Sequence, residues 1–231
     1  LKRYVFHESG TLVSGIIGGL YSSTATISVL ARKSRKASEQ EATDYVAAML
    51  LAVSMMFLRF MILILIFSRE IFLSIYPYLL TMAVVAAIVA WFIHSRQKRS
   101  NDQPVEEEED DSSNPLEFKV ALIFAVLFVI FTFLTHYTLV YAGTGGLNLL
   151  SFVSGFSDIT PFILNLLQNT GSVAALIITA CSMQAIISNI MVNMFYALFF
   201  AGKGSKLRPW ILGGFGVVIA CNLVLLLFFY I

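Results

Sequence analysis

Long apolar runs separated by short polar segments make up most of the chain. A helix crosses the hydrocarbon core of a bilayer with about 20 predominantly apolar residues, and the sequence has seven runs of roughly this length. The pattern therefore predicts seven membrane-spanning helices. Their predicted positions are residues 10–31, 45–67, 71–93, 120–141, 147–167, 173–200 and 210–231.

The composition agrees with this pattern. Hydrophobic residues make up 58% and charged residues 13% of the chain, whereas soluble domains carry about 25% charged residues. We therefore predict an all-α, polytopic transmembrane helix bundle surrounded by the lipid bilayer. The net charge of +1 does not indicate a nucleic-acid partner. Cys181 and Cys221 lie inside apolar runs, away from a second cysteine or a histidine at ligand spacing, so we expect buried thiols and no cofactor.

Lysine and arginine residues in the loops predict the orientation, because they accumulate on the cytoplasmic side. With seven complete crossings, eight basic residues would share the side reached by the end of the first span, against six on the other side. This excess favours the first group as cytoplasmic, in a multi-pass protein of the bacterial inner membrane. The first group is Arg32, Lys33, Arg35, Lys36, Arg96, Lys98, Arg99 and Lys119, and the second is Lys2, Arg3, Arg69, Lys203, Lys206 and Arg208.

The first and fifth spans share a pattern of glycine and hydroxyl residues, which indicates an internal repeat. Since three complete spans would separate them, both should run the same way, as parallel repeats. The first repeat lacks a counterpart of the linker helix before Leu1, so we expect the chain to be part of a longer protein. The aligned positions are Gly19 with Gly155, Ser22 with Asp158, and residues 54–59 with 188–193. The predicted parts are a first three-helix repeat (1–95), a polar acidic loop (96–116), a linker helix (117–143) and a second three-helix repeat (144–231).

The small and hydroxyl residues in the first and fifth spans have two interpretations. They allow neighbouring helices to approach closely, with the hydroxyls bonded to their own backbone. Alternatively, the glycines interrupt the helices, and the freed N–H groups or carbonyls face an ion. Pro161 follows Gly155 and Asp158 closely and lacks an N–H, which favours an interruption of the fifth span.

Arg59 and Asp158 are charged residues inside apolar runs. A charge at the bilayer centre costs at least about 2.5 kcal/mol on insertion scales, so such residues face the bundle interior and find partners. They would either form an ion pair that fixes helix packing or line a polar path for an ion, with Asp158 as the candidate metal ligand. The residues predicted to line this path are Gly19, Ser22, Ser23, Thr24, Arg59, Gly155, Asp158, Thr160, Asn189 and Asn193.

Five stretches of the chain resemble, in the same order, the bacterial family called domain of unknown function 4010. They are GGLYSSTATISVLARKSR (18–35), MMFLRFMILIL (55–65), NPLEFKVALIFAVLF (114–128), LLSFVSGFSDIT (149–160) and SNIMVN (188–193). The resemblance covers nearly the whole chain and implies an association with MgtC/SapB-type domains, and through them with magnesium or other ion homeostasis. That family usually has a glycine and two aspartates, one residue apart, in the fifth span. Here Asp158 matches the first aspartate and Thr160 replaces the second, while Asn193 stands where a lysine is common.

These features predict a transporter or channel for a small ion, linked to magnesium or another divalent cation. The alternative is a non-transporting membrane regulator or scaffold whose polar core fixes helix packing. An enzyme is not predicted, because the sequence has no HExxH, phosphate-binding glycine loop, CxxC or nucleophile–base pair. Bundles of this size commonly form homodimers. A second copy, and an MgtC-type domain that this chain lacks, are therefore the protein partners considered.

Overall fold

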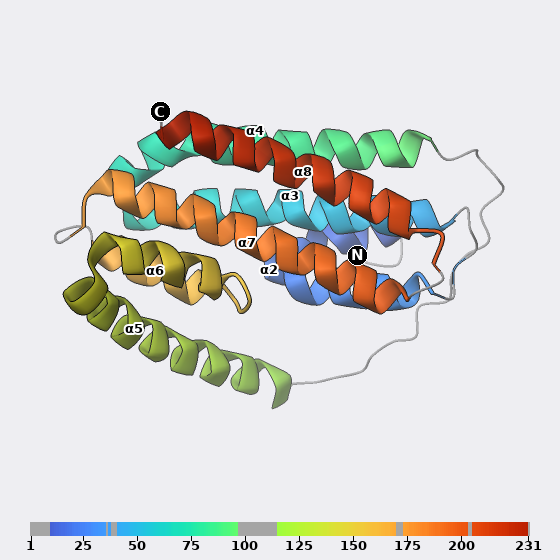
Figure 1. Ribbon diagram of the computed structural model, residues 1–231. Helices are drawn as coiled ribbons and strands as arrows, with labels where there is room; N and C mark the ends of the chain where they lie inside the picture. The colour runs from blue at the N-terminus through green and yellow to red at the C-terminus, as the bar shows by residue number, and fades with distance from the viewer. Residues whose placement is uncertain are drawn as a thin grey trace. The chain divides into compact units, whose positions relative to one another are not determined.

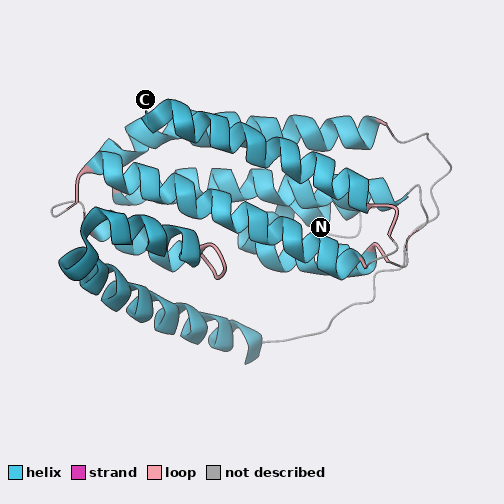
Figure 2. Cartoon of the chain, in the orientation of Figure 1, coloured by secondary structure: helices cyan, strands magenta, loops and turns pink. Residues whose placement is uncertain are grey.

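The computed structural model is helical in the part of the chain that it describes, which comprises residues 10–35, 37, 41–96, 115–169, 173–202 and 205–230. Figure 2 shows helices joined by short loops, with no strand in these ranges. The predicted polytopic helix bundle is therefore confirmed. The helices, labelled in Figure 1, are α2 (Gly10–Lys33), α3 (Glu41–Phe67), α4 (Arg69–Ser95), α5 (Pro115–Ser154), α6 (Thr160–Gln168), α7 (Ala175–Ala201) and α8 (Arg208–Tyr230).

Six of the described segments have the length and apolarity needed to cross a membrane, one fewer than predicted. The segment that does not qualify is the predicted fifth span, 147–167, because the structure divides it into two short helices. The six segments are Gly10–Lys33, Thr43–Phe67, Arg69–Ser95, Val126–Gly143, Ala175–Ala201 and Arg208–Phe228. The chain is thus a multi-pass membrane protein.

The chain forms two compact units. The first contains Leu1–Asp102 and Ile190–Ile231, and the second contains Gln103–Asn189. Helix α7 therefore contributes its N-terminal half to the second unit and its C-terminal half to the first. The domain boundaries predicted from the sequence follow the repeat instead, and they remain a prediction.

Helix α2 is a hairpin of two helical arms. Ser22 has extended backbone angles (φ −155°, ψ 108°) between the arms. A Cβ added at Gly18 would lie 2.5 Å from the hydroxyl of Thr26, although residues eight apart in a straight helix are separated by about 12 Å. The two arms therefore fold back on each other at Ser22. We call α2 the first hairpin and the residues around Ser22 its tip.

The first arm of α2 runs in the same direction as α3. Gly15 lies against the backbone of Ala48, and Gly19 lies against that of Ala52, one turn further along both helices. Ala52 is near the middle of α3, so the tip reaches about halfway along that helix. The second arm then returns to the end where α3 begins. The predicted first span is consequently a re-entrant element that enters and leaves on one side, and in Figure 1 the blue α2 accompanies only part of α3.

A second hairpin follows the bend in α5 at Gly143. Gly143 has φ 59° and ψ −149°, a conformation that is readily available only to glycine. The arm Gly145–Ser154 then runs parallel to α7, because Asn148 accepts a hydrogen bond from Cys181 (3.3 Å) and Ser151 donates one to Gln184 (2.9 Å). Gly155 lies against Ser188, near the middle of α7.

Helix α6 is the returning arm of this second hairpin. If α6 continued onward from the tip, its end would lie more than about 30 Å from the start of α7. The few residues between Gln168 and Ala175 cannot cover that distance, because an extended chain spans only about 3.5 Å per residue. The second hairpin, residues 145–168, therefore enters and leaves at the end where α7 begins. Figure 2 draws its tip as a pink loop.

Helices α3 and α7 run in opposite directions. Arg35, just after α2, donates from Nε to the carbonyl of Phe200 and from Nη2 to that of Phe199, the latter at 3.2 Å. The guanidinium of Arg32 lies 4.3 Å from the centre of the Phe200 ring. The end of α7 is therefore at the side where α2 closes and α3 begins.

The first predicted repeat consists of the first hairpin, α3 and α4, and the second consists of the second hairpin, α7 and α8. The predicted parallel arrangement assumed that the first and fifth spans each cross the membrane completely. A hairpin adds no crossing, so α3 and α4 run in directions opposite to those predicted relative to the start of α2. The orientation of the two repeats relative to each other remains a prediction.

Contacts within the repeats share one register. Gly155 and Ser188 lie 136 positions after Gly19 and Ala52 (155 − 19 and 188 − 52). Asp158, in the second tip, also lies 136 positions after Ser22. The contacts therefore agree with the predicted alignment of the two hairpins. The predicted alignment of the partner helices is shifted by two residues, since it placed Ser54 rather than Ala52 opposite Ser188.

Helix α8 packs antiparallel to α4 in the first unit. A Cβ on Gly214 would meet the side chains of Leu50 and Ile93, both near the side where α3 begins. Near the other side, the hydroxyl of Tyr78 donates to Oδ1 of Asn222 at 2.5 Å. Helix α8 thus begins at the same side as α3.

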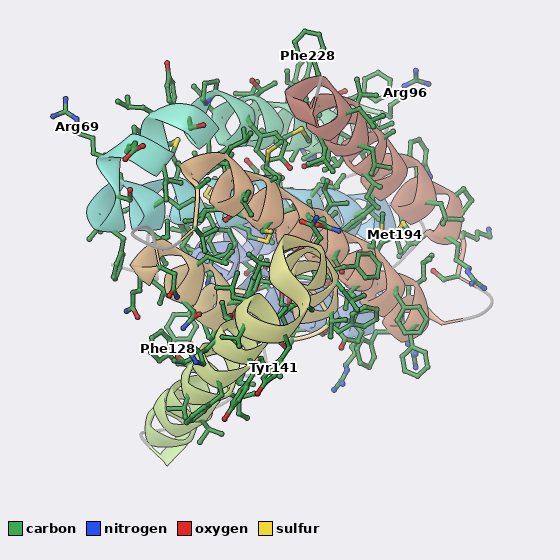
Figure 3. The ribbon with its side chains drawn as sticks, turned by 60° about the vertical axis from the view of Figure 1, so that its left-hand side comes forward. Arg69, Arg96, Phe128, Tyr141, Met194 and Phe228 are labelled. Carbon is green, nitrogen blue, oxygen red and sulfur yellow. The ribbon has the colours of Figure 1, made fainter. Side chains whose placement is uncertain are left out.

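The packing of α2, α3, α4 and α8 brings most described basic residues of the first unit to one side, which we call the basic end. Lys206 and Arg208, predicted to lie opposite Arg32, lie on its side instead, because α8 begins there. The described residues at the basic end are Arg32, Lys33, Arg35, Arg96, Lys206 and Arg208, and Arg69 lies at the other end. Figure 3 shows Arg69 and Arg96 extending from the two ends of α4.

We expect the basic end to face the cytoplasm, because loop lysines and arginines are retained there. In a background with Cys181→Ala and Cys221→Ala, an impermeant maleimide added to intact cells should label Arg69→Cys. Lys206→Cys should become labelled only after the cells are permeabilised. The reverse labelling pattern would contradict the orientation, and equal labelling of both sites would contradict the assignment of the two ends.

Candidate functional site

Ser22 interrupts the first hairpin and caps its second arm. Its hydroxyl oxygen accepts a hydrogen bond from the N–H of Ala25 at 3.4 Å, and its carbonyl accepts one from the Thr26 hydroxyl at 2.8 Å. An extended residue whose side-chain oxygen binds the N–H three residues later is an N-cap. Of the two interpretations of the glycine and hydroxyl pattern, an interrupted helix is thus found at Ser22.

Asp158 has the same role in the second hairpin. Its Oδ1 accepts hydrogen bonds from the backbone N–H of Thr160 at 2.9 Å and from the Thr160 hydroxyl at 2.7 Å. Ile159 already has helical angles (φ −74°, ψ −12°), and Pro161 occupies the first turn of α6, where its missing N–H costs no hydrogen bond. A carboxylate at a helix N-terminus is also favoured by the helix dipole. The predicted interruption of the fifth span is therefore found at residues 155–159.

A polar side chain of the partner helix binds each tip. Arg59 of α3 donates from Nη1 to the carbonyl of Tyr21 at 2.7 Å. Asn189 of α7 donates from Nδ2 to the carbonyls of Gly155 and Ser157 at 3.2 and 3.4 Å. Tyr21 and Ser157 directly precede the two capping residues, where the end of an arm leaves carbonyls without a helical partner. Arg59 and Asn189 therefore have equivalent roles in the two repeats, because each donates hydrogen bonds to backbone carbonyls at a hairpin tip.

The predicted glycines allow this close approach. A Cβ at Gly19 would lie 2.5 Å from Cα of Ala52, and one at Gly155 would lie 2.7 Å from the backbone nitrogen of Asn189. Non-bonded heavy atoms approach to about 3.5–4.0 Å. Both interpretations of the glycine pattern therefore apply. The glycines allow each arm to pack closely on its partner helix, and the residues that follow them interrupt the helix.

Arg59 and Asp158 belong to different compact units. Arg59 is half-buried, with its guanidinium 5.1 Å from the centre of the Phe60 ring, and Asp158 is exposed. Each has a local role at its own tip, as described above. The predicted pairing of the two charges remains a prediction.

The other predicted residues have less specific positions. Ser23 is buried, and the carbonyl of Thr24 accepts a hydrogen bond from the Ser28 hydroxyl at 2.8 Å. Asn193 is fully buried on α7. Within the described ranges, no three His, Cys, Asp or Glu side chains gather in a way that could hold a metal ion. Asp158 as a metal ligand thus remains a prediction.

Sequence reasoning missed a polar cluster between the second hairpin and α7. It consists of Asn148 and Ser151 on the arm and Cys181 and Gln184 on α7, joined by the two hydrogen bonds that establish the direction of the arm. In addition, Ser188 donates to the carbonyl of Phe152 at 2.6 Å. The recurrence of polar residues every three or four positions on α7 is the signal that could have identified this face.

Residues 1–201 match the family described as a domain of unknown function (DUF4010). The chain belongs to this family. The DUF4010 match includes both hairpins, their partner helices and every residue predicted for the ion path. The chain is also similar to an uncharacterized protein of Aquifex aeolicus (strain VF5), with 25% identity over 224 residues that cover 96% of each protein. No solved structure matches the chain.

Proposed function

We propose that this protein is a transporter for a small ion and that the two hairpin tips bind the ion or control its passage. The observation that carries the proposal is the pair of interrupted helices. Each ends at the middle of its partner helix, and each has a capping side chain and a cross-helix donor at its tip.

Physical chemistry favours transport over a purely structural role for these tips. Non-helical backbone at membrane depth is tolerated only where it is covered by protein or lines a water-filled cavity. Repeats with discontinuous helices are a common architecture of secondary transporters, and their ions bind at the helix breaks near the midplane.

The charges suggest how an ion would be held. Asp158 offers a carboxylate beside freed carbonyls, which suits a cation, and magnesium would be surrounded there by oxygen ligands. Arg59 and the N-terminal end of an arm suit an anion. The association with MgtC-type domains that the family resemblance implies favours magnesium or another divalent cation, and the bacterial inner membrane as the location.

Flux measurements on proteoliposomes would test this proposal. Asp158→Asn should reduce the flux at least about tenfold, because asparagine is an equally good N-cap but lacks the charge. Arg59→Gln should have a similar effect, since it retains a donor for Tyr21 but loses its charge. The flux would be measured after jumps of magnesium chloride, sodium chloride and sodium gluconate concentration, so that the cation and the anion are distinguished.

Asp44→Asn is the matched control. Oδ1 of Asp44 lies 2.7 Å from Nδ1 of His94 at the basic end, away from the tip of the first hairpin, so replacement of Asp44 should leave the flux intact. Unchanged flux in both tip variants would overturn the role of these residues. Absence of flux for all three salts in the wild-type protein would favour the regulator instead.

A further inference from the structure

Four aromatic side chains cluster on the last two turns of α7, in the first unit. Phe195 stacks on Phe199 with ring centres 6.1 Å apart, and Phe199 meets Phe200 edge-on at 5.3 Å. Tyr196 lies 6.1 Å from the Phe200 ring. Phe195 and Phe199 are 61% and 63% exposed, whereas Ala197, on another face of the helix, is fully buried. The end of α7 therefore presents an exposed apolar face made of two stacked rings.

Three basic residues at the end of α2 adjoin this aromatic cluster. The guanidinium of Arg32 lies 4.3 Å from the centre of the Phe200 ring. Arg35 donates to the carbonyls of Phe199 and Phe200, which uses only part of the N–H donor set of a guanidinium. Lys33 follows Arg32 in the last turn of α2, and all three basic side chains are exposed. Figure 1 shows the ends of α2 and α7 next to each other.

The positive charge of these three residues is only partly balanced within the first unit. Among the described residues, no carboxylate lies within ion-pair distance of them, and Asp44 at the same end contacts His94 instead. The C-terminal end of a helix carries about half a negative charge. The ends of α2 and α7 thus offset about one of the three positive charges, and a partner with negative charge would be attracted to the remainder.

Charge and apolar surface follow each other in the order found in a phospholipid. Helix α7 ends at Ala201, so Phe199 and Phe195 lie about 3 Å and about 9 Å deeper along its axis. The basic side chains are consequently at the level of the headgroups, and the exposed rings are among the acyl chains. A soluble anion would match the charges but leave the rings uncovered, and an apolar helix would cover the rings but leave the charges unbalanced.

We propose that Arg32, Lys33, Arg35, Phe195 and Phe199 form a binding site for an anionic phospholipid, which we call the lipid site. The basic side chains contact the phosphate through charge-assisted hydrogen bonds, and the two exposed rings pack against an acyl chain. The bound lipid joins the closing end of the first hairpin to the end of α7. This inference goes beyond the transport proposal and does not depend on it, because lipid binding is measured without ion flux.

Native mass spectrometry of the full chain in detergent tests the lipid site. Titration with dioleoylphosphatidylglycerol and dioleoylphosphatidylcholine compares an anionic with a zwitterionic headgroup on identical acyl chains. The first phosphatidylglycerol should bind at least about tenfold more tightly, and Lys33→Gln should weaken it about fivefold, which is the usual contribution of one basic residue beside anionic lipid. Arg69→Gln is the matched control, because it removes an exposed positive charge at the other end and should leave the binding unchanged.

The exposed rings are tested separately from the charges. The double variant Phe195→Ala, Phe199→Ala should weaken both lipids by a similar factor, because their acyl chains are identical, and should keep the preference for phosphatidylglycerol. Unchanged affinity in this variant would overturn the acyl-chain contact. Size-exclusion chromatography would verify before each titration that the variant is folded.

Two further results would overturn the lipid site as a whole. One is equal affinity of the wild-type protein for the two lipids, and the other is an equal loss of binding in Lys33→Gln and Arg69→Gln. Displacement of phosphatidylglycerol by an equimolar amount of glycerol 3-phosphate would instead identify the site as one for a soluble phosphate, and this result would also overturn the proposal.

Discussion

Gly19→Ala is expected to destabilise the protein by about 1–3 kcal/mol, the usual cost of forcing an extra group into a packed site. Its Cβ would overlap the backbone of Ala52, and a backbone cannot move aside as a flexible side chain can. Gly155→Ala should have a comparable effect against Ser188 and Asn189. Unfolding in mixed micelles of increasing SDS content, followed by the fluorescence of Trp91 and Trp210, would measure the change.

Gly216→Ala is the control for this pair. A Cβ on Gly216, in α8, meets nothing within 4 Å, and alanine is favoured over glycine in a helix interior by about 1 kcal/mol. We therefore expect Gly216→Ala to be neutral or stabilising. If it lowered stability as much as Gly19→Ala, the close seating of the hairpin on α3 would not explain the requirement for glycine.

Asn189→Leu is expected to loosen the second tip and to cost about 1–3 kcal/mol for each carbonyl that loses its donor. Leucine has a similar volume but cannot bind the carbonyls of Gly155 and Ser157. Besides lower stability, faster amide hydrogen exchange should appear at residues 156–160, before any global unfolding.

Ile190→Leu provides a neighbouring control for this variant. Ile190 is also fully buried, and a volume-conserving apolar change usually costs less than about 1.5 kcal/mol. It should leave exchange at the second tip unchanged. Uniformly faster exchange along α7 in Asn189→Leu, without a local effect at residues 156–160, would contradict the tip role of Asn189.

Hydropathy located the apolar segments well but could not tell how α2 uses its length. Its 24 residues correspond to about 36 Å of helix, which suits one full crossing and also two half-length arms. The reversal occurs at Ser22, whose extended backbone distinguishes it from the next two hydroxyl residues, Ser23 and Thr24. One undetected reversal was then enough to place Lys206 and Arg208 on the wrong side.

The glycine and hydroxyl pattern was more informative than hydropathy. It identified the positions of both tips, and Pro161 correctly favoured a break in the second. The partners of Arg59 and Asn189 could not be predicted, because both bind backbone carbonyls. Every residue carries such a carbonyl, so the acceptors leave no trace in the amino-acid sequence. The side-chain network around Gln184 was readable in principle, since polar residues recur there at helical spacing.

The first hairpin has a consequence for how such a chain could arise by gene duplication. A hairpin followed by two full helices, as in α2, α3 and α4, returns to the side from which it started. Two copies of such a unit fused end to end would therefore insert in the same orientation. Only one additional crossing between the copies would reverse the second, so a single linking helix would be enough to turn a tandem duplication into an inverted pair.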